Sequence, residues 1–116
     1  MAAGINLTQH ASEDAANFAR FAALGLKIQI TEADMHVAVQ NGFASAADLQ
    51  VQARAYRDMV NGCLRTPNCT AIEIEGIYDG QAWVSDPTQW GAPVLYDIRM
   101  QPKPAYYAVQ AALAAR

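Results

Sequence analysis

The spacing of apolar residues along the chain predicts strands and helices in alternation. Residues 27–31 (KIQIT) and 70–77 (TAIEIEGI) alternate polar and apolar side chains, as strands with one buried face do. Between them, Ser45 and Asp48 form a capping-box-like helix start, and apolar residues then recur at steps of three and four. The members of this stripe are Leu49, Ala53, Tyr56, Val60, Cys63 and Leu64.

The N-terminal part of the chain also shows the apolar spacing of a strand and of a helix. Residues 4–8 are a candidate short strand. Ser12 is the expected N-cap of a helix whose apolar face includes Phe18 and Ala22, and Gly25 is its expected left-handed C-cap.

The C-terminal part is predicted to hold a long loop and a last helix. Residues 78–101 show no period, and loops this long in a compact domain usually serve a function. Pro104 is expected to begin the helix, because its fixed φ suits the first helical position. Tyr106, Val109 and Leu113 form one apolar stripe along it.

Strands that alternate with helices imply right-handed βαβ units, a parallel sheet and therefore an α/β fold. Two parallel architectures stay open at this point, the open doubly wound sheet and the closed barrel. The chain has no linker or low-complexity segment, so one piece and no second domain are expected. It also contains neither glycine-rich phosphate-binding motif.

Composition narrows the classes of partner. Of the 116 residues, 53% are hydrophobic and 16% charged, which is typical of a globular chain. The net charge is −3 and basic residues form no stripe, so a nucleic-acid partner is not expected. No apolar run approaches the roughly 18 residues of a membrane span. The N-terminus lacks the pattern of a signal peptide, so a secretion signal would have to lie upstream.

Cys63 and Cys69 flank a segment that contains Pro67 and Asn68 and reads as a tight loop. A disulfide across this loop and two free thiols are both compatible with the sequence. Zinc is not indicated, because two further ligands of the usual spacing are missing.

Glu32 and Asp34 are the strongest chemical feature, since they follow directly on the strand predicted at 27–31. Active sites of parallel barrels lie at the C-terminal ends of the strands, where a carboxylate can act as nucleophile or base. The alternative is that both are ordinary loop acids, one of which caps the segment that follows.

The segment Ile30-Thr-Glu-Ala-Asp34 is similar to the I-T-E-x-D pattern of family 10 xylanases, and further segments extend the resemblance in the family's order. Gly76-Ile-Tyr-Asp79 followed by Ala82-Trp83 resembles G-x-x-D-x-x-S-W, Val94-Leu-Tyr-Asp97 resembles L-L-Y-D, and Pro102-Lys-Pro-Ala-Tyr106 matches P-K-P-A-Y. The resemblance implies the C-terminal segment of a (β/α)8 barrel, from strand 6 to helix 8, with residues 1–116 forming three βα units of one partial glycosidase domain.

The resemblance also implies roles for individual residues. Glu32 takes the place of the catalytic nucleophile, and Asp34 would orient the site. His10 falls near the histidine of G-x-Q-x-H that hydrogen-bonds the nucleophile, although Thr8 stands where the pattern has Gln. Trp83 resembles the tryptophan that stacks on the sugar. Without the resemblance, His10 would be read as a helix-entry residue and Trp83 as core packing.

Three further positions enter through the resemblance, a pair of cysteines and a glutamate. Cys63 and Cys69 match a disulfide that many members have between helix 7 and strand 8. Glu75 replaces the tryptophan of the family's W-G and is placed among the substrate-binding residues. It would share a strand face with Glu73, an arrangement that is costly unless the acids are paired or wet. The change should weaken sugar stacking, and a displaced acid/base at Glu75 is the alternative role.

The implied activity is retaining hydrolysis of β-1,4-xylan by an endo-xylanase, with no metal or organic cofactor. Such a mechanism needs a second carboxyl group about 5–5.5 Å from the nucleophile. In the family this acid/base follows strand 4, which this chain does not carry. The implied partners are xylan or xylo-oligosaccharide and a complementary N-terminal barrel segment or another copy of the chain, with no nucleic acid and no membrane. The implied location is secreted.

Two other hypotheses stay open. One is a non-catalytic carbohydrate-binding fragment in which Trp83, Trp90 and Tyr78 stack on sugars. The other is a structural part-barrel that pairs with another chain or with itself.

Overall fold

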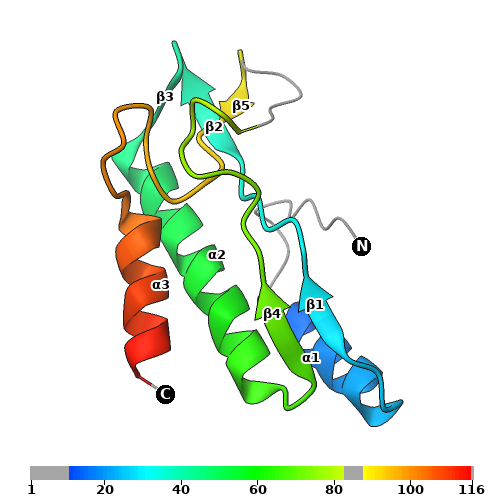
Figure 1. Cartoon of the computed structure of the whole chain (residues 1–116). Helices are drawn as coiled ribbons and strands as arrows, with labels where there is room; N and C mark the ends of the chain where they lie inside the picture. The colour runs from blue at the N-terminus through cyan, green and yellow to red at the C-terminus, as the bar shows by residue number, and fades with distance from the viewer. Residues whose placement is uncertain (1–10, 83–87, 116) are drawn as a thin grey trace.

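A computed structural model describes residues 11–82 and 88–115 (Figure 1). Within them lie three helices and five short strands. In chain order these are α1 (Ala11–Ala23), β1 (Ile28–Ile30), β2 (Val37–Gln40), β3 (Phe43–Ala44), α2 (Ala46–Arg65), β4 (Cys69–Ile72), β5 (Trp90–Gly91) and α3 (Pro104–Ala114). The candidate strand at 4–8 lies outside the described residues.

β1 and β4 form a parallel pair in which Ile30 lies opposite Ile72. The helix α2 lies on the crossover between them and packs against β4, while α1 packs against β1. α2 and α3 run side by side in the same direction (Figure 1). The predicted α/β arrangement of parallel strands joined through helices is therefore confirmed.

The helix ends follow from local chemistry. The side chain of Ser45 accepts a hydrogen bond from the Asp48 backbone N–H at 3.1 Å, so the predicted N-cap of α2 is confirmed. Gly25 has a φ of +74° and ends α1 as predicted. The backbone N–H groups of Gly25 and Leu26 donate to the carbonyls of Ala22 and Phe21, the pattern of a Schellman motif.

The start of α1 differs from the prediction. The described helix already begins at Ala11, so Ser12 lies inside it and is not its N-cap. Ser12, Glu13 and Asp14 favour any position in a first turn, and this preference does not fix the starting residue to within one position. Pro104 does begin α3, as predicted, with Lys103 as its N-cap.

A second sheet, with strand order β3-β2-β5, was not predicted. β2 and β3 form a hairpin around Asn41 and Gly42, whose φ angles of 53° and 80° suit a type I′ turn. β5 pairs with β2 from the other side and lies inside the stretch expected to be irregular. The small sheet lies at the end of the molecule toward which β1 and β4 run (Figure 1).

β4 is shorter than the predicted strand 70–77, because it ends at Ile72. Gly76 has a φ of +108° and Ile77 is exposed, so the chain has left the sheet there. The core lies between α2, α3 and the strands. Its wholly buried members include Tyr56, Met35 and Val37.

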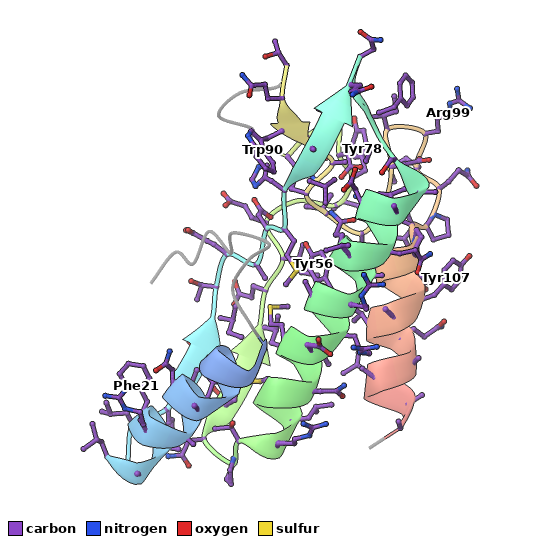
Figure 2. All side chains as sticks on the ribbon, turned by 180° about the vertical axis from the view of Figure 1, so that it is seen from behind. Phe21, Tyr56, Tyr78, Trp90, Arg99 and Tyr107 are labelled. Atoms are coloured by element: carbon purple, nitrogen blue, oxygen red, sulfur yellow. A yellow bond between two sulfur atoms is a disulfide. The ribbon has the colours of Figure 1, made fainter. Side chains whose placement is uncertain are left out.

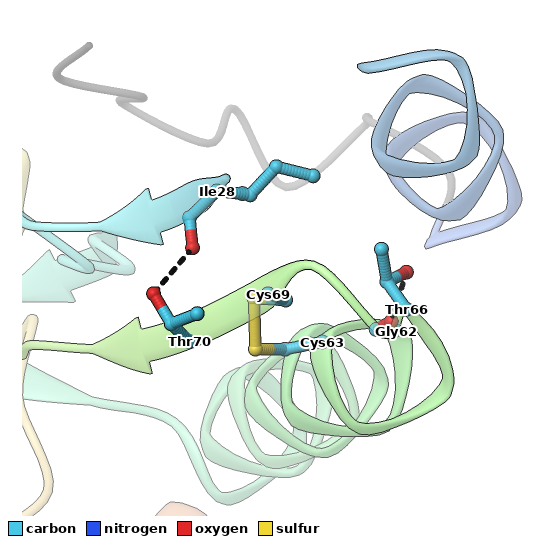
Figure 3. The surroundings of a disulfide bond; sticks show 6 residues. All are labelled: Ile28, Gly62, Cys63, Thr66, Cys69 and Thr70. Carbon is cyan, nitrogen blue, oxygen red and sulfur yellow. Dashed lines mark hydrogen bonds between the residues drawn. A yellow bond between two sulfur atoms is a disulfide. The ribbon is translucent and has the colours of Figure 1, made fainter. Parts of the chain in front are cut away.

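A disulfide joins Cys63, in the last turn of α2, to Cys69, the first residue of β4 (Figure 3). Their Cα atoms lie 5.2 Å apart. The Thr66 hydroxyl donates to the Gly62 carbonyl, and Thr66 N–H to that of Cys63. The turn after α2 is thus closed by both covalent and hydrogen bonds.

Candidate active site

The C-terminal ends of β1 and β4 place four carboxylates on neighbouring segments. The Glu73 N–H donates to the Ile30 carbonyl at 2.7 Å, and the Ala33 N–H donates to the Glu73 carbonyl at 2.9 Å. Parallel pairing thus continues past the strands, and Glu32 and Asp34 lie beside Glu73 and Glu75. In a parallel barrel this is the edge that carries the active site.

Glu32 is exposed, whereas Ala33 beside it is only 2% exposed. The buried alanine fixes the backbone, and the carboxylate before it stays open to a substrate. Glu73 and Glu75 are exposed as well. The burial cost expected for these two acids on an inward strand face therefore does not arise in this structure.

Asp34 is half-buried and has a raised pKa. Burial is the largest cause, and the charge of Glu75 adds to it. Nearby His36 and the backbone N–H of Glu75 oppose the shift, while Glu32 makes a small further contribution in the raising direction. The Oδ1 atom of Asp34 is buried without a hydrogen-bond partner in the part of the chain that the structure describes. The pKa of Asp34 is therefore raised first by burial and then by the charges of its acidic neighbours.

Two buried side chains of α2, Gln52 and Tyr56, contact the backbone that follows Glu32. The Tyr56 hydroxyl lies 2.9 Å from the carbonyl oxygen of Ala33, and Gln52 Nε2 donates to that of Met35 at 2.7 Å. The same two groups also contact the carbonyls of Pro93 and Ala92. Figure 2 shows Tyr56 pointing from α2 into the interior.

A buried ion pair lies beside this network. Lys103 Nζ is 3.0 Å from Asp79 Oδ2, and the two side chains are 4% and 6% exposed. Asp79 also accepts from the Val94 N–H, and Lys103 donates to the Ala92 carbonyl. Burial lowers the pKa of Lys103 and raises that of Asp79, each against the effect of its partner. The pair ties the loop after β4 to the start of α3.

The structure thus brings together only part of the predicted site. Glu32, Asp34 and Glu75 lie on adjacent strand-end segments, whereas His10 and Trp83 lie outside the described residues. Trp90 is 44% exposed and lies on β5, in the small sheet. Among residues 11–82 and 88–115, no group of three or more His, Cys, Asp or Glu side chains is arranged to hold a metal ion. No described helix is both long and apolar enough to cross a membrane.

Sequence reasoning missed Gln52, Tyr56, Asp79 and Lys103 as part of this region. Tyr56 was assigned only to the apolar stripe of the helix. Gln52 lies one turn before it on the same face, and a polar residue on a buried face was the available signal. The pairing of Asp79 with Lys103 spans 24 residues and had no local signal.

The model of glycosyl hydrolase family 10 matches residues 3–112. The chain belongs to this family. Its α/β fold is accordingly the C-terminal segment of a family 10 (β/α)8 barrel. The parallel β1–β4 pair, with Glu32 at its C-terminal edge, is a piece of that barrel's wall.

Known proteins resemble the chain over most of its length. It is 35% identical over 106 residues to Exoglucanase XynX of Acetivibrio thermocellus, covering 90% of this chain and 9% of that protein. It is 36% identical over 95 residues to Endo-1,4-beta-xylanase B of Thermotoga neapolitana, covering 81% and 27%.

Solved family 10 structures also superpose on most of this chain. Native xylanase 10B from Thermotoga maritima superposes with a TM-score of 0.84 at 31% identity, covering 92% of this chain and 33% of that one. An intracellular xylanase from Thermoanaerobacterium saccharolyticum gives a TM-score of 0.77 at 34% identity, covering 91% and 31%. The chain spans a third or less of the length of these relatives.

Proposed function

We propose that this chain is the C-terminal third of a retaining endo-1,4-β-xylanase and carries its catalytic nucleophile, Glu32. The observation that carries the proposal is the exposed Glu32 carboxylate at the C-terminal edge of the parallel β1–β4 pair, in a chain that belongs to family 10. Three of the relatives above are named xylanases, and xylan or xylo-oligosaccharide is the proposed substrate.

In the proposed reaction the Glu32 carboxylate attacks the anomeric carbon, and the bond from that carbon to the leaving oxygen breaks. The resulting glycosyl ester is then hydrolysed by water, with net retention of configuration. A separate acid/base first donates a proton to the leaving oxygen and then accepts one from the water. That group would come from the part of the barrel that precedes this chain.

The other site residues keep subsidiary roles in the proposal. Asp34 orients the strand-end segment, and its pKa is raised first by burial and then by the charge of Glu75. His10 would hydrogen-bond the nucleophile, and Trp83 and Glu75 would contact the sugar.

We also propose that residues 1–116 act as one partial barrel domain of three βα units. A separate N-terminal segment that carries the first five strands of the complete barrel would complete it. A secreted location is proposed from the Cys63–Cys69 disulfide, because such bonds persist in oxidising compartments. Family membership alone does not indicate secretion, since one relative is an intracellular xylanase.

Reassembly tests the proposed activity. The chain alone should not hydrolyse xylan, because general acid assistance is typically worth 10²–10⁴-fold and most of the barrel is absent. Mixed with a family 10 segment that carries the first five strands of the complete barrel, it should produce reducing ends from xylan. Glu32→Gln keeps the side-chain shape and should abolish this activity, whereas Glu73→Gln on the adjacent segment should not. Full activity of Glu32→Gln would refute the proposed nucleophile.

A further inference from the structure

The backbone on either side of Asp34 has left the sheet and needs other partners. The Ala33 N–H is the last to pair with the β4 segment, and the Met35 N–H instead donates to the Pro93 carbonyl at 3.1 Å. The carbonyls of Ala33 and Met35 are therefore left to side-chain donors. Buried backbone carbonyls without a donor are costly, so the identity of those donors matters.

Both donors come from one face of α2. Gln52 and Tyr56 are four residues apart, which places them one turn from each other on the same side of the helix. Both are 0% exposed. Gln52 has two N–H bonds, one for the Met35 carbonyl and one for that of Ala92. The single hydroxyl proton of Tyr56 is shared between the carbonyls of Ala33 and Pro93, at 2.9 and 2.6 Å.

These contacts join two segments that are distant in sequence. One carries Glu32 and Asp34, and the other, at 92–93, is where the chain returns from the loop after β4. The second segment has a further contact, because the Ala92 carbonyl also accepts a hydrogen bond from Lys103. α2 therefore holds the strand-end segment against a segment that is itself bound from the start of α3.

The arrangement carries an energetic cost that packing alone does not require. The Oε1 atom of Gln52 is buried with no partner in the described part of the chain. A buried amide group left half-satisfied is worse for stability than an apolar side chain of the same shape. The benefit that we identify is geometric, since the position of Ala33 determines where the carboxylate of Glu32 points.

We propose that Gln52 and Tyr56 are positioning residues that fix the backbone around Asp34 and thereby aim Glu32 at the barrel mouth. The inference rests on the proposed function for its catalytic part, but not for its structural part. A misplacement of about 1 Å can cost as much as 10²-fold in rate, so a loosened segment should lower turnover.

Amide hydrogen exchange on the chain tests the structural part. Tyr56→Phe keeps the ring and removes the hydroxyl, and Gln52→Met removes both donors at similar length. In each variant the amides of Ala33 and Met35 should exchange at least about 10-fold faster, while core amides of α2 and α3 stay within about twofold. The matched controls, Tyr107→Phe and Gln50→Met, lie at exposed positions and should change neither set.

Turnover in the reassembled barrel tests the catalytic part. Both variants should lower kcat by about 10-fold and leave KM within about twofold, because the sugar-binding surface is untouched. Equal acceleration of exchange throughout the chain would overturn the inference in favour of general core stabilisation. Faster local exchange with unchanged kcat would overturn the catalytic role. If Tyr56→Phe fails to fold, the exchange rates and kcat of Gln52→Met alone test the positioning role.

The two proposals fail in different ways. An inactive barrel with the unsubstituted chain, or an active one with Glu32→Gln, counts against the proposed xylanase function. Neither result alters the exchange rates at Ala33 and Met35, which test the positioning inference on their own.

Discussion

At the scale of single residues, the state of Asp34 shows how the strand ends act together. Its carboxyl group is half-buried, and Glu75 on the adjacent segment raises its pKa further. A carboxyl whose pKa is higher in the folded protein binds a proton more tightly there than in the unfolded chain. Its contribution to stability is therefore present at low pH and is lost as the pH rises above the usual value of 3.8 through the folded pKa.

Carbon-detected NMR titration of the aspartate carboxyl groups checks this directly. The midpoint for Asp34 should lie above its usual value, and Glu75→Gln should lower it, because a neighbouring negative charge is removed. Glu73→Gln is the matched control, since Glu73 does not contribute to the shift of Asp34. A midpoint for Asp34 at or below the usual value would show that the carboxyl is not in this environment.

The Asp79–Lys103 pair makes a second prediction at this scale. Lys103→Met should destabilise the chain by about 3–5 kcal/mol, because it leaves a buried carboxylate without its partner. Arg57→Met removes one partner of an exposed pair, with Asp58, and should cost less than about 1 kcal/mol. Urea denaturation of both variants compares them. Similar small losses in both would mean that Asp79 is not held in a buried ion pair.

At the scale of elements, local patterns predicted the helices well and the second sheet not at all. The apolar stripe of α2 and its Ser45 cap are visible in the sequence because they involve neighbours within one or two turns. Val37 and Val39 alternate with exposed residues before Asn41-Gly42, which is a hairpin signal, although the strand has only four residues. β5 has only two residues and depends on β2, so its own sequence could not reveal it.

The site divides in the same way. The position of Glu32 and Asp34 after a strand could be predicted, because it depends on local alternation and on the family resemblance. The contacts of Tyr56 with Ala33 and Pro93 could not, since they span 23 and 37 residues and depend on how α2 packs. Long-range contacts of buried polar groups are set by the tertiary fold, and no local period records them.

The turn of the new hairpin can be tested with a pair of glycine variants. Gly42 has a φ of +80°, so Gly42→Ala should destabilise the chain by about 1–2 kcal/mol. Gly62 lies within α2, and an added methyl group would meet only Phe18, at 3.7 Å. Gly62→Ala should therefore stabilise the chain by about 0.5–1 kcal/mol. Thermal denaturation of both variants should give shifts in Tm of opposite sign, and a stabilising Gly42→Ala would contradict the type I′ turn.

At the scale of the whole molecule, the chain presents surfaces that a complete barrel would cover. In the described structure β1 and β4 pair only with each other, so each has an open edge. A groove of about 480 Å³ lies between β4 and the helices α2 and α3, and its lining includes Leu64, Ile72 and Leu113. Open edges beside apolar grooves favour association with another chain.

We therefore expect the isolated chain not to remain a monomer. Light scattering over a range of concentrations should show species heavier than 12.5 kDa. Addition of a segment that carries the first five strands of the complete barrel should replace these species with a one-to-one complex. A single 12.5 kDa species at high concentration would instead indicate a self-contained fold.

The central claim is that Glu32 is the nucleophile of a retaining glycosidase. A mechanism-based 2-fluoro-xylobioside with a good leaving group forms a covalent ester with the nucleophile and stalls before hydrolysis. Peptide mapping by mass spectrometry of the labelled, reassembled barrel then identifies the modified side chain. We predict a single label on Glu32, and a label on Glu75, Asp34 or any residue of the complementary segment would contradict the claim.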